Sequence, residues 1–207
     1  MTTRQAAWQP GLPESGDPVV GRYPGLLDAL HERSAPGSLV ASPRGHVLAS
    51  PVALPAAPPG PLHRFGLAVV AHHPGTVSAG PPAECFAVGL LDLHHGLLRD
   101  TLRQAIEHLG ARSSGGTTLL NKQLVQGQLA DAARDLAEHE AMPVERRQGD
   151  PAARWRTHAR LLGTGHHLLM LFGASGFLAC APAADLHLAA VTGNVYLHPG
   201  AEGGTDD

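Results

Sequence analysis

The distribution of proline divides this chain into two parts that must fold differently. Fourteen of the 18 prolines lie at or before Pro82, and only four follow it. Because proline removes a backbone donor and interrupts the interior of a helix, residues 1–82 cannot hold long helices. We therefore expect a proline-rich, irregular segment with a few short β-strands over 1–82, and a mainly α-helical unit over 83–207.

The spacing of apolar residues in the second part predicts four helices joined by short connections. The expected helices are 83–109, 117–139, 150–172 and 182–192. Asp150 followed by Pro151 is the favoured start of a helix, and Gly110 is a natural stop. His166 falls on the expected apolar stripe of the third helix. Such helices form an antiparallel up-down four-helix bundle.

Short elements are also expected in the proline-rich part. The runs 37–42, 46–50 and 65–71 are apolar and bounded by Gly, Pro or Ser, as strands are. The stretch 24–33 favours one short helix. We therefore expect this part to be irregular, with a few strands and one short helix.

Composition limits the environment and the partners. The formal net charge is -3 and only 16% of residues are charged, which gives no reason to expect nucleic acid or an acidic membrane surface as a partner. No apolar run reaches the roughly 20 residues that span a bilayer. Two cysteines without a CxxC motif and the absence of a secretion signal favour buried thiols in a cytoplasmic protein.

Three blocks of the second part resemble the C-terminal helical domain of the acyl-CoA dehydrogenase family, in the order that the family has them. They are GLLRDTLRQAIEHLGARSSGG (96–116), LLNKQLVQGQLADAARDLAE (119–138) and LFGASGFLACAPAADLHLAAVTGNVYLHPG (171–200). The first block ends like the family's Arg-x-x-Phe-Gly, the second carries a glutamine ahead of Leu-Ala-Asp, and the third resembles the Phe-Gly-Gly-x-Gly-Phe turn. The resemblance covers about 83–200.

The resemblance implies a flavin, FAD, shared between the subunits of a dimer. Arg112 and Gln123 match the residues that reach a neighbour's FAD pyrophosphate, and Gly173 and Gly176 match the turn beside its adenosine. A guanidinium suits this role because it binds phosphate through two parallel hydrogen bonds. The alternative for Arg112 is a solvated arginine that the helix dipole favours. Other matching positions depart from the family, at Gly115, Met170 and Ala174.

The family's general base is absent. The glutamate that should follow Tyr196 is Leu197, and an alternative base position falls on Phe86. The ionisable residues that remain as candidates for proton transfer are Glu84, His166, His187 and His198. Adjacent histidine pairs point in different directions on a helix, so we predict no metal site.

Three functions stay open. In the first, the chain resembles a truncated dehydrogenase that pairs with itself or with a full-length relative at a flavin and acyl-thioester site. Its first part would be at most a remnant of the family's β domain. The second is a non-redox bundle that binds an apolar or polyketide-like acyl substrate for cyclisation or isomerisation. The third is a structural dimer without a ligand. All three predict a homo-oligomer or hetero-oligomer, either a dimer or a tetramer.

Overall fold

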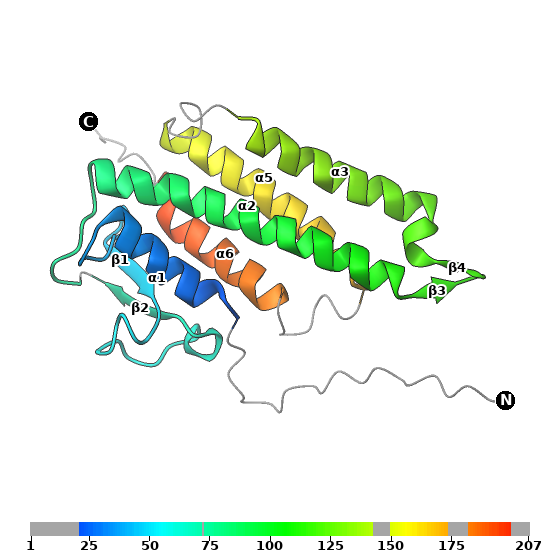
Figure 1. Cartoon of the computed structure of the whole chain (residues 1–207). Helices are drawn as coiled ribbons and strands as arrows, with labels where there is room; N and C mark the ends of the chain where they lie inside the picture. Colours follow the sequence, from blue (N-terminus) through cyan, green and yellow to red (C-terminus); the bar gives the residue numbers. More distant parts are fainter. Residues whose placement is uncertain (1–20, 72, 143–149, 174–181, 200–207) are drawn as a thin grey trace, which may run out of the picture.

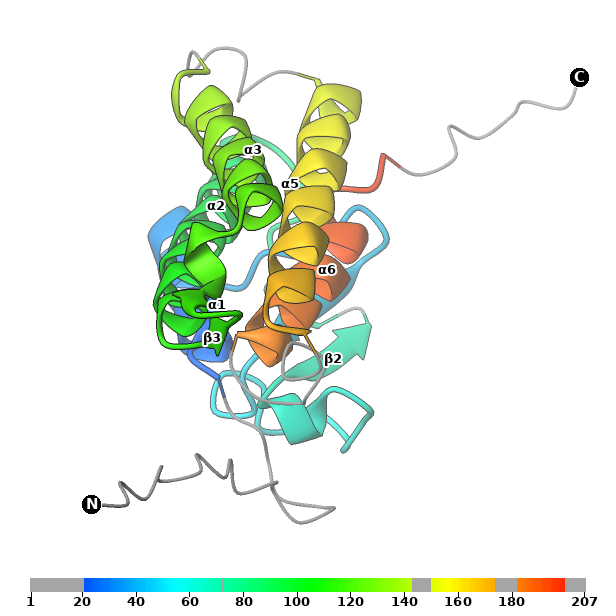
Figure 2. The same ribbon diagram turned by 90° about the vertical axis from the view of Figure 1, so that its right-hand side faces the viewer.

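A computed structural model describes residues 21–71, 73–142, 150–173 and 182–199 of the chain (Figure 1). Its body is an antiparallel up-down bundle, which confirms the predicted four-helix architecture. The bundle helices are α2 (Pro81–Gly110), α3 (Gln123–Glu140), α5 (Pro151–Leu171) and α6 (Ala183–Tyr196). The long helix α2 packs against the other three, and α5 packs against both α3 and α6 (Figure 2).

The proline-rich part covers one side of this bundle. Helix α1 (Tyr23–Ser34) packs on α2 and α6, and the antiparallel pair β1 (His46–Ala49) and β2 (Ala68–Ala71) lies beneath it (Figure 1). A short 3-10 turn, His63–Phe65, precedes β2. The expected helix and two of the three expected strands are therefore present.

The third expected strand, over 37–42, is absent. Val40 forms only an isolated bridge with Val77, and the Ala41 amide donates to the Val77 carbonyl at 2.9 Å. The run forms no continuous ladder with a strand: beyond Val77, the Val40 amide donates to His31 Nδ1, and only the Ser42 amide reaches β1, at the His46 carbonyl. Its apolar character reflects burial under α1 rather than membership of a sheet.

Helix α5 starts where the sequence predicts, whereas α3 starts later than predicted. The Asp150 carboxylate accepts a hydrogen bond from the Ala153 amide at 2.6 Å, which caps α5 as predicted. Helix α3 begins only at Gln123. The residues expected to open it instead form one strand of a hairpin, β4 (Thr117–Thr118), and a 3-10 turn, Leu119–Asn121. The partner strand of the hairpin is β3 (Ser113–Ser114).

Two adjacent glycines explain the hairpin. Gly115 and Gly116 have φ of 63° and 81°, the left-handed region that other residues rarely adopt. A two-residue turn with positive φ at both positions matches the twist of paired strands. The chain therefore reverses direction in a short hairpin, in which two residues pair with two others, before α3 begins.

The main core joins both parts of the chain. Tyr23 and Leu27 of α1 and Leu48 of β1 are buried in one cluster with the inward faces of the bundle helices. On α5 the buried line is rotated from the predicted stripe: His158, Leu161 and Leu168 are buried, whereas His166 is exposed. Because α5 is apolar around more than one face, periodicity alone did not select the buried one.

Two further expectations concern environment. Cys85 is exposed, so the prediction that it is a buried thiol is wrong, and Cys180 lies outside the described residues. None of the helices in the described ranges is long and apolar enough to cross a membrane.

Candidate functional site

A pocket lies where α2 begins and α6 ends, and we call it the α2–α6 pocket. It has a volume of about 320 Å³ and is lined by residues of both helices and of the loop before α2. Phe86 and Leu197, 1% and 4% exposed, both form its walls. These are the two positions at which the family resemblance expects a general base. They are far apart in the sequence, yet the fold brings them to one cavity.

Three ionisable side chains line the same pocket. Glu84 lies in the first turn of α2, where the helix dipole favours a negative charge. His198 follows the end of α6 and packs edge-on against Trp155, with ring centroids 4.8 Å apart. Arg154, which the sequence analysis did not single out, adds a cation from α5. The pocket thus combines apolar walls with a carboxylate, an imidazole and a guanidinium.

Tyr196 also lines this pocket, but its hydroxyl is committed elsewhere. It accepts a hydrogen bond from the Leu48 amide at 2.9 Å and donates to the Val40 carbonyl at 3.2 Å. Burial raises the pKa of Tyr196 above its usual range, so the phenol stays protonated. Tyr196 therefore ties α6 to β1, and its hydroxyl is occupied by these two hydrogen bonds.

The predicted flavin-binding residues gather at the opposite end of the bundle, around the β3–β4 hairpin. Arg112 is exposed just after α2, and its Nη1 lies 3.2 Å from Nε2 of His108. Burial and the nearby Arg112 charge lower the pKa of His108, while a hydrogen bond to the backbone of Phe172 opposes that shift. A neutral His108 accepts from Arg112 and donates to Phe172, so it links Arg112 to the end of α5.

Gly173 and Gln123 lie at this same end. Gly173 follows Phe172 with φ of 61°, and its backbone is exposed. Gln123 is the exposed first residue of α3. A small buried apolar cluster lies at this end of the bundle: Ala105, Leu109, Leu129 and Phe172. Gly176 lies outside the described residues. A guanidinium, a side-chain amide and a backbone amide are each groups that can donate a hydrogen bond to a phosphate.

The two groups of predicted residues occupy opposite ends of α2 (Figure 1). Glu84 and Arg112 are 28 residues apart on or beside this helix. At 1.5 Å of rise per residue, their backbones are separated by about 40 Å. One chain therefore does not bring its candidate acid–base residues and its candidate phosphate ligands into one site.

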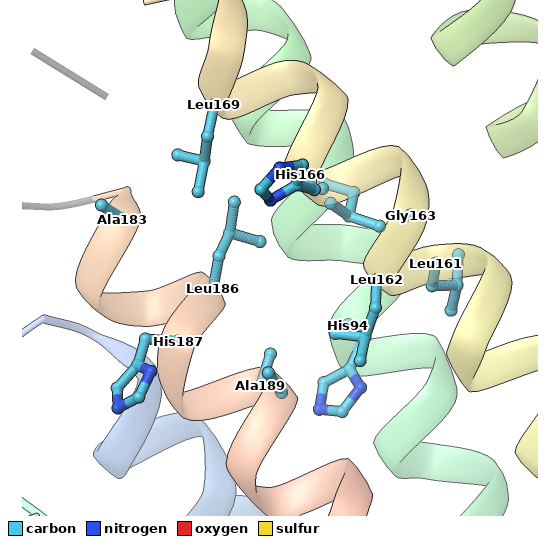
Figure 3. A pocket seen from close by; sticks show the side chains of 13 residues that line it. His94, Leu161, Leu162, Gly163, His166, Leu169, Ala183, Leu186, His187 and Ala189 are labelled. Carbon is cyan, nitrogen blue, oxygen red and sulfur yellow. The ribbon is translucent and has the colours of Figure 1, made fainter. Parts of the chain in front are cut away.

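The remaining histidine candidates line a second cavity, of about 480 Å³, which we call the α5–α6 cavity (Figure 3). His166 and His187 are exposed at its rim, one on each helix. His94 of α2 is 2% exposed and forms part of its inner wall. His94 stood out in the sequence only as half of an adjacent histidine pair, because its bonding partners are 71 and 98 residues away.

No described residues form a group of three or more His, Cys, Asp or Glu placed to hold a metal ion. His95 and His139 stack with ring centroids 4.8 Å apart. His95 Nε2–H donates to the Leu136 carbonyl at 3.0 Å. The structure thus uses this histidine pair to join α2 to α3.

Comparison with known proteins gives fold similarity alone. No protein-family model and no curated protein matches the sequence. A variant of the Tcur3481-Tcur3483 steroid ACAD, an acyl-CoA dehydrogenase, is similar at 17% identity and a TM-score of 0.49, over 73% of this chain and 45% of the other. Butyryl-CoA dehydrogenase from Megasphaera elsdenii is similar at 16% identity and a TM-score of 0.43, over 64% and 39%.

This chain therefore spans less than half the length of either dehydrogenase. Its fold is similar, over part of the chain, to that of acyl-CoA dehydrogenases, the family that its motifs resemble. The similarity assigns neither an activity nor a cofactor to this chain.

Proposed function

We propose that this chain is an acyl-CoA dehydrogenase-like subunit that contributes to a flavin and acyl-thioester site formed between chains, and that it lacks the family's general base. The observation that carries the proposal is the meeting of Phe86 and Leu197 in the α2–α6 pocket. Two independent motif positions, both expected at the reacting carbon of an acyl thioester, converge on one cavity. Such convergence supports the resemblance residue by residue.

The α2–α6 pocket would take the acyl group. Phe86 and Leu197 present apolar walls to it, and Arg154 supplies a positive charge for an anionic thioester carrier. Neither wall residue accepts a proton, and loss of a general base costs typically 10²- to 10⁴-fold in rate. The chain by itself would therefore bind an acyl thioester without removing its α-proton efficiently.

The hairpin end would hold a flavin of another chain. FAD, when bound, supplies a ring that accepts hydride. Arg112 would donate to its pyrophosphate, with Gln123 and the Gly173 backbone beside it. Because about 40 Å separates the two ends of α2, a separation beyond the reach of one dinucleotide, each chain would serve two different sites. This favours a homo-oligomer or a mixed assembly with a full-length relative.

Binding of hexanoyl-CoA, measured by isothermal titration calorimetry, tests the acyl pocket. Ala83 lines the pocket and is half-buried, so Ala83→Trp would fill it and weaken binding at least tenfold. Ala137→Trp, at an exposed position of α3, is the matched control and should bind as the wild type does. Absence of binding to the wild type, or equal affinity of both variants, contradicts the proposal.

A second candidate function uses the same pocket without flavin. Glu84 and His198 line a cavity whose walls are otherwise mainly apolar, an arrangement suited to proton transfer during cyclisation or isomerisation of an apolar acyl substrate. Under this alternative, Glu84→Gln or His198→Ala would lower flavin-free turnover about 10²- to 10⁴-fold. If turnover by the wild type is instead lost when FAD is removed, the result supports the flavin-dependent function proposed first.

A further inference from the structure

A groove of about 750 Å³ runs between helices α1 and α2, and we call it the α1–α2 groove. The two helices pack side by side and run antiparallel (Figure 1). Arg22, just before α1, pairs with Asp100 of α2 at 2.5 Å. Arg33, in the last turn of α1, lies near Gly89 of α2, because a Cβ at Gly89 would be 3.9 Å from its Nη2. These two meeting points are separated by about 16 Å on both helices, which is about three helical turns.

The residues that line the groove recur along both helices at the same spacing. On α1 the spacing is four, three and four residues, at Arg22, Leu26, Ala29 and Arg33. On α2 it is again four, three and four, at Gly89, Leu93, Gly96 and Asp100. Such spacing is the one by which a helix presents a single face to a neighbouring helix. The groove is therefore lined by two parallel stripes with the periodicity of a helix interface.

The middle of the groove is apolar and open. Leu26 is 40% exposed, and Leu93 is half-buried opposite it. Ala29 is exposed, and a Cβ at Gly96 would meet no atom within 4 Å. Because Ala29 and Gly96 have little or no side chain, a third helix can approach α1 and α2 closely here. Apolar residues at the same spacing on that helix would cover Leu26 and Leu93.

Arginines predominate among the charged residues around this apolar middle. The charged residues that line the groove are four arginines and two aspartates: Arg22, Arg33, Arg99, Arg103, Asp92 and Asp100. The groove thus has an excess of positive charge in a chain whose formal net charge is -3. Arg33 is exposed and forms no ion pair or hydrogen bond through its side chain with any of the described residues. A guanidinium in this state is suited to a carboxylate, which it can bind through two parallel hydrogen bonds.

We propose that the α1–α2 groove binds an amphipathic helix of a partner protein, with apolar side chains at heptad spacing toward the groove and carboxylates along its flanks. The repeated four-three-four spacing selects a helix over an extended peptide, and the excess of arginine selects acidic flanks. The residues of this groove line neither the α2–α6 pocket nor the α5–α6 cavity. The inference therefore does not depend on flavin or acyl-thioester binding.

Fluorescence anisotropy with designed peptides tests the chemistry of the partner. The probe is a labelled peptide of three Leu-Ala-Ala-Leu-Glu-Gln-Glu heptads, which places leucine on one face and glutamate on both flanks. A second peptide has lysine in place of every glutamate, and a third keeps the composition but moves the leucines off the heptad spacing. The acidic heptad peptide should bind about tenfold more tightly than either control. Equal affinity of either control, or no binding of the acidic peptide at about 1 mM, would overturn the proposal.

Two glycines provide a matched test of the location. Gly96→Glu adds a side chain and a negative charge inside the groove, so it should weaken binding of the acidic peptide about tenfold. Gly127→Glu, at an exposed position of α3, should leave binding unchanged. A Cβ at either position meets no atom within 4 Å, and glutamate favours a helix more than glycine does, so both variants should fold. Unchanged binding by Gly96→Glu would exclude the α1–α2 groove.

A matched pair of arginines tests the charge of the groove. Arg33→Ala should lower affinity for the acidic peptide about three- to tenfold, because it removes a cation that this chain does not itself neutralise. Arg156→Ala, at an exposed position of α5 outside the groove, should not change it. Equal affinities of the two variants would contradict the role given to Arg33.

A second copy of this chain is the alternative occupant of the groove. Sedimentation of the wild type and of Gly96→Glu distinguishes the two cases. A dimer that Gly96→Glu converts to a monomer would make the groove an interface between copies and overturn the proposal. Failure of hexanoyl-CoA or FAD to bind would contradict the proposed function and leave this inference standing, so the two proposals fail separately.

Discussion

The two ends of the bundle are built differently. The end beside α1, which we call the packed end, buries Phe86 and Tyr196 under the proline-rich part, together with Tyr23 of α1, with hydrogen bonds that cross between distant elements. The end beside the β3–β4 hairpin, the hairpin end, has a small apolar cluster and leaves Leu124 76% exposed and Ile106 41% exposed. The packed end holds most of the buried side chains and one pocket, and the hairpin end presents apolar and basic groups around a small buried cluster.

This difference separates buried residues that hold the elements together, some of which also line the α2–α6 pocket, from an exposed surface at the hairpin end. Residues at the packed end hold the elements together, so most substitutions there should act through folding. Exposed apolar side chains beside Arg112 and Gln123 form the kind of surface that a partner chain covers. Substitutions at the hairpin end should therefore change binding and leave folding almost unaffected.

The largest expected contrast comes from one leucine at each end. Leu90 is fully buried, so Leu90→Ala should lower the free energy of unfolding by about 2–5 kcal/mol. Leu124→Ala should change it by less than about 0.5 kcal/mol, because the side chain is exposed. Urea unfolding of the two variants measures both. A loss above about 2 kcal/mol for Leu124→Ala would contradict the division between the ends.

Acid should weaken the packed end next. Burial lowers the pKa of His158 to about 4 and that of His94 well below its usual value. Between pH 6.5 and 4 the unfolded chain binds protons that the folded chain does not, so stability falls as pH falls. For His158 the loss is up to about 3 kcal/mol at 1.36 kcal/mol per pKa unit.

Unfolding free energies at pH 7 and pH 4.5 measure this acid effect. Buried carboxylates also contribute to acid unfolding, so the specific check is the variant His158→Phe. Its free energy of unfolding should fall less steeply between pH 7 and pH 4.5, because unfolding of the variant takes up as much as one proton fewer. An unchanged pH slope in His158→Phe would show that His158 is protonated in the folded chain.

A smaller contrast, opposite in sign, comes from two helical glycines. A Cβ at Gly193 of α6 would lie 2.0 Å from the His158 ring, so Gly193→Ala should cost about 1–3 kcal/mol. A Cβ at Gly127, near the start of α3, meets nothing, so Gly127→Ala should add about 0.5–1 kcal/mol. Thermal unfolding of the pair checks both signs. Stabilisation by Gly193→Ala would mean that α6 and α5 separate more easily than the packing indicates.

The sequence predicted the helices better than their contacts. Apolar spacing located the bundle helices, and Asp150 and Pro151 located the start of α5. These signals are local, because each lies within a few residues of the feature that it predicts. The same signals misplaced the start of α3, because two consecutive positive-φ glycines form a hairpin that apolar spacing does not reveal. They also left the buried face of α5 undecided.

The candidate sites show the same limit. The family resemblance pointed to Phe86 and Leu197 separately, but only the fold brings them into one pocket. His94 was visible only as half of an adjacent histidine pair, and its role depends on Tyr23 and Thr192, which fold back from the two ends of the chain. Roles that arise from such long-range pairing are not encoded in local pattern.

The most direct test of the proposed function is the affinity for FAD, measured by calorimetry on the wild type and on Arg112→Ala. Arg99→Ala is the matched control, because Arg99 is an exposed arginine on the same helix whose ion pair with Glu140 lies away from the hairpin end. We predict that Arg112→Ala weakens FAD binding about tenfold, as expected for loss of a charge-assisted phosphate contact, and that Arg99→Ala does not. Equal FAD affinities for the wild type and Arg112→Ala would contradict the assignment of the hairpin end to a flavin.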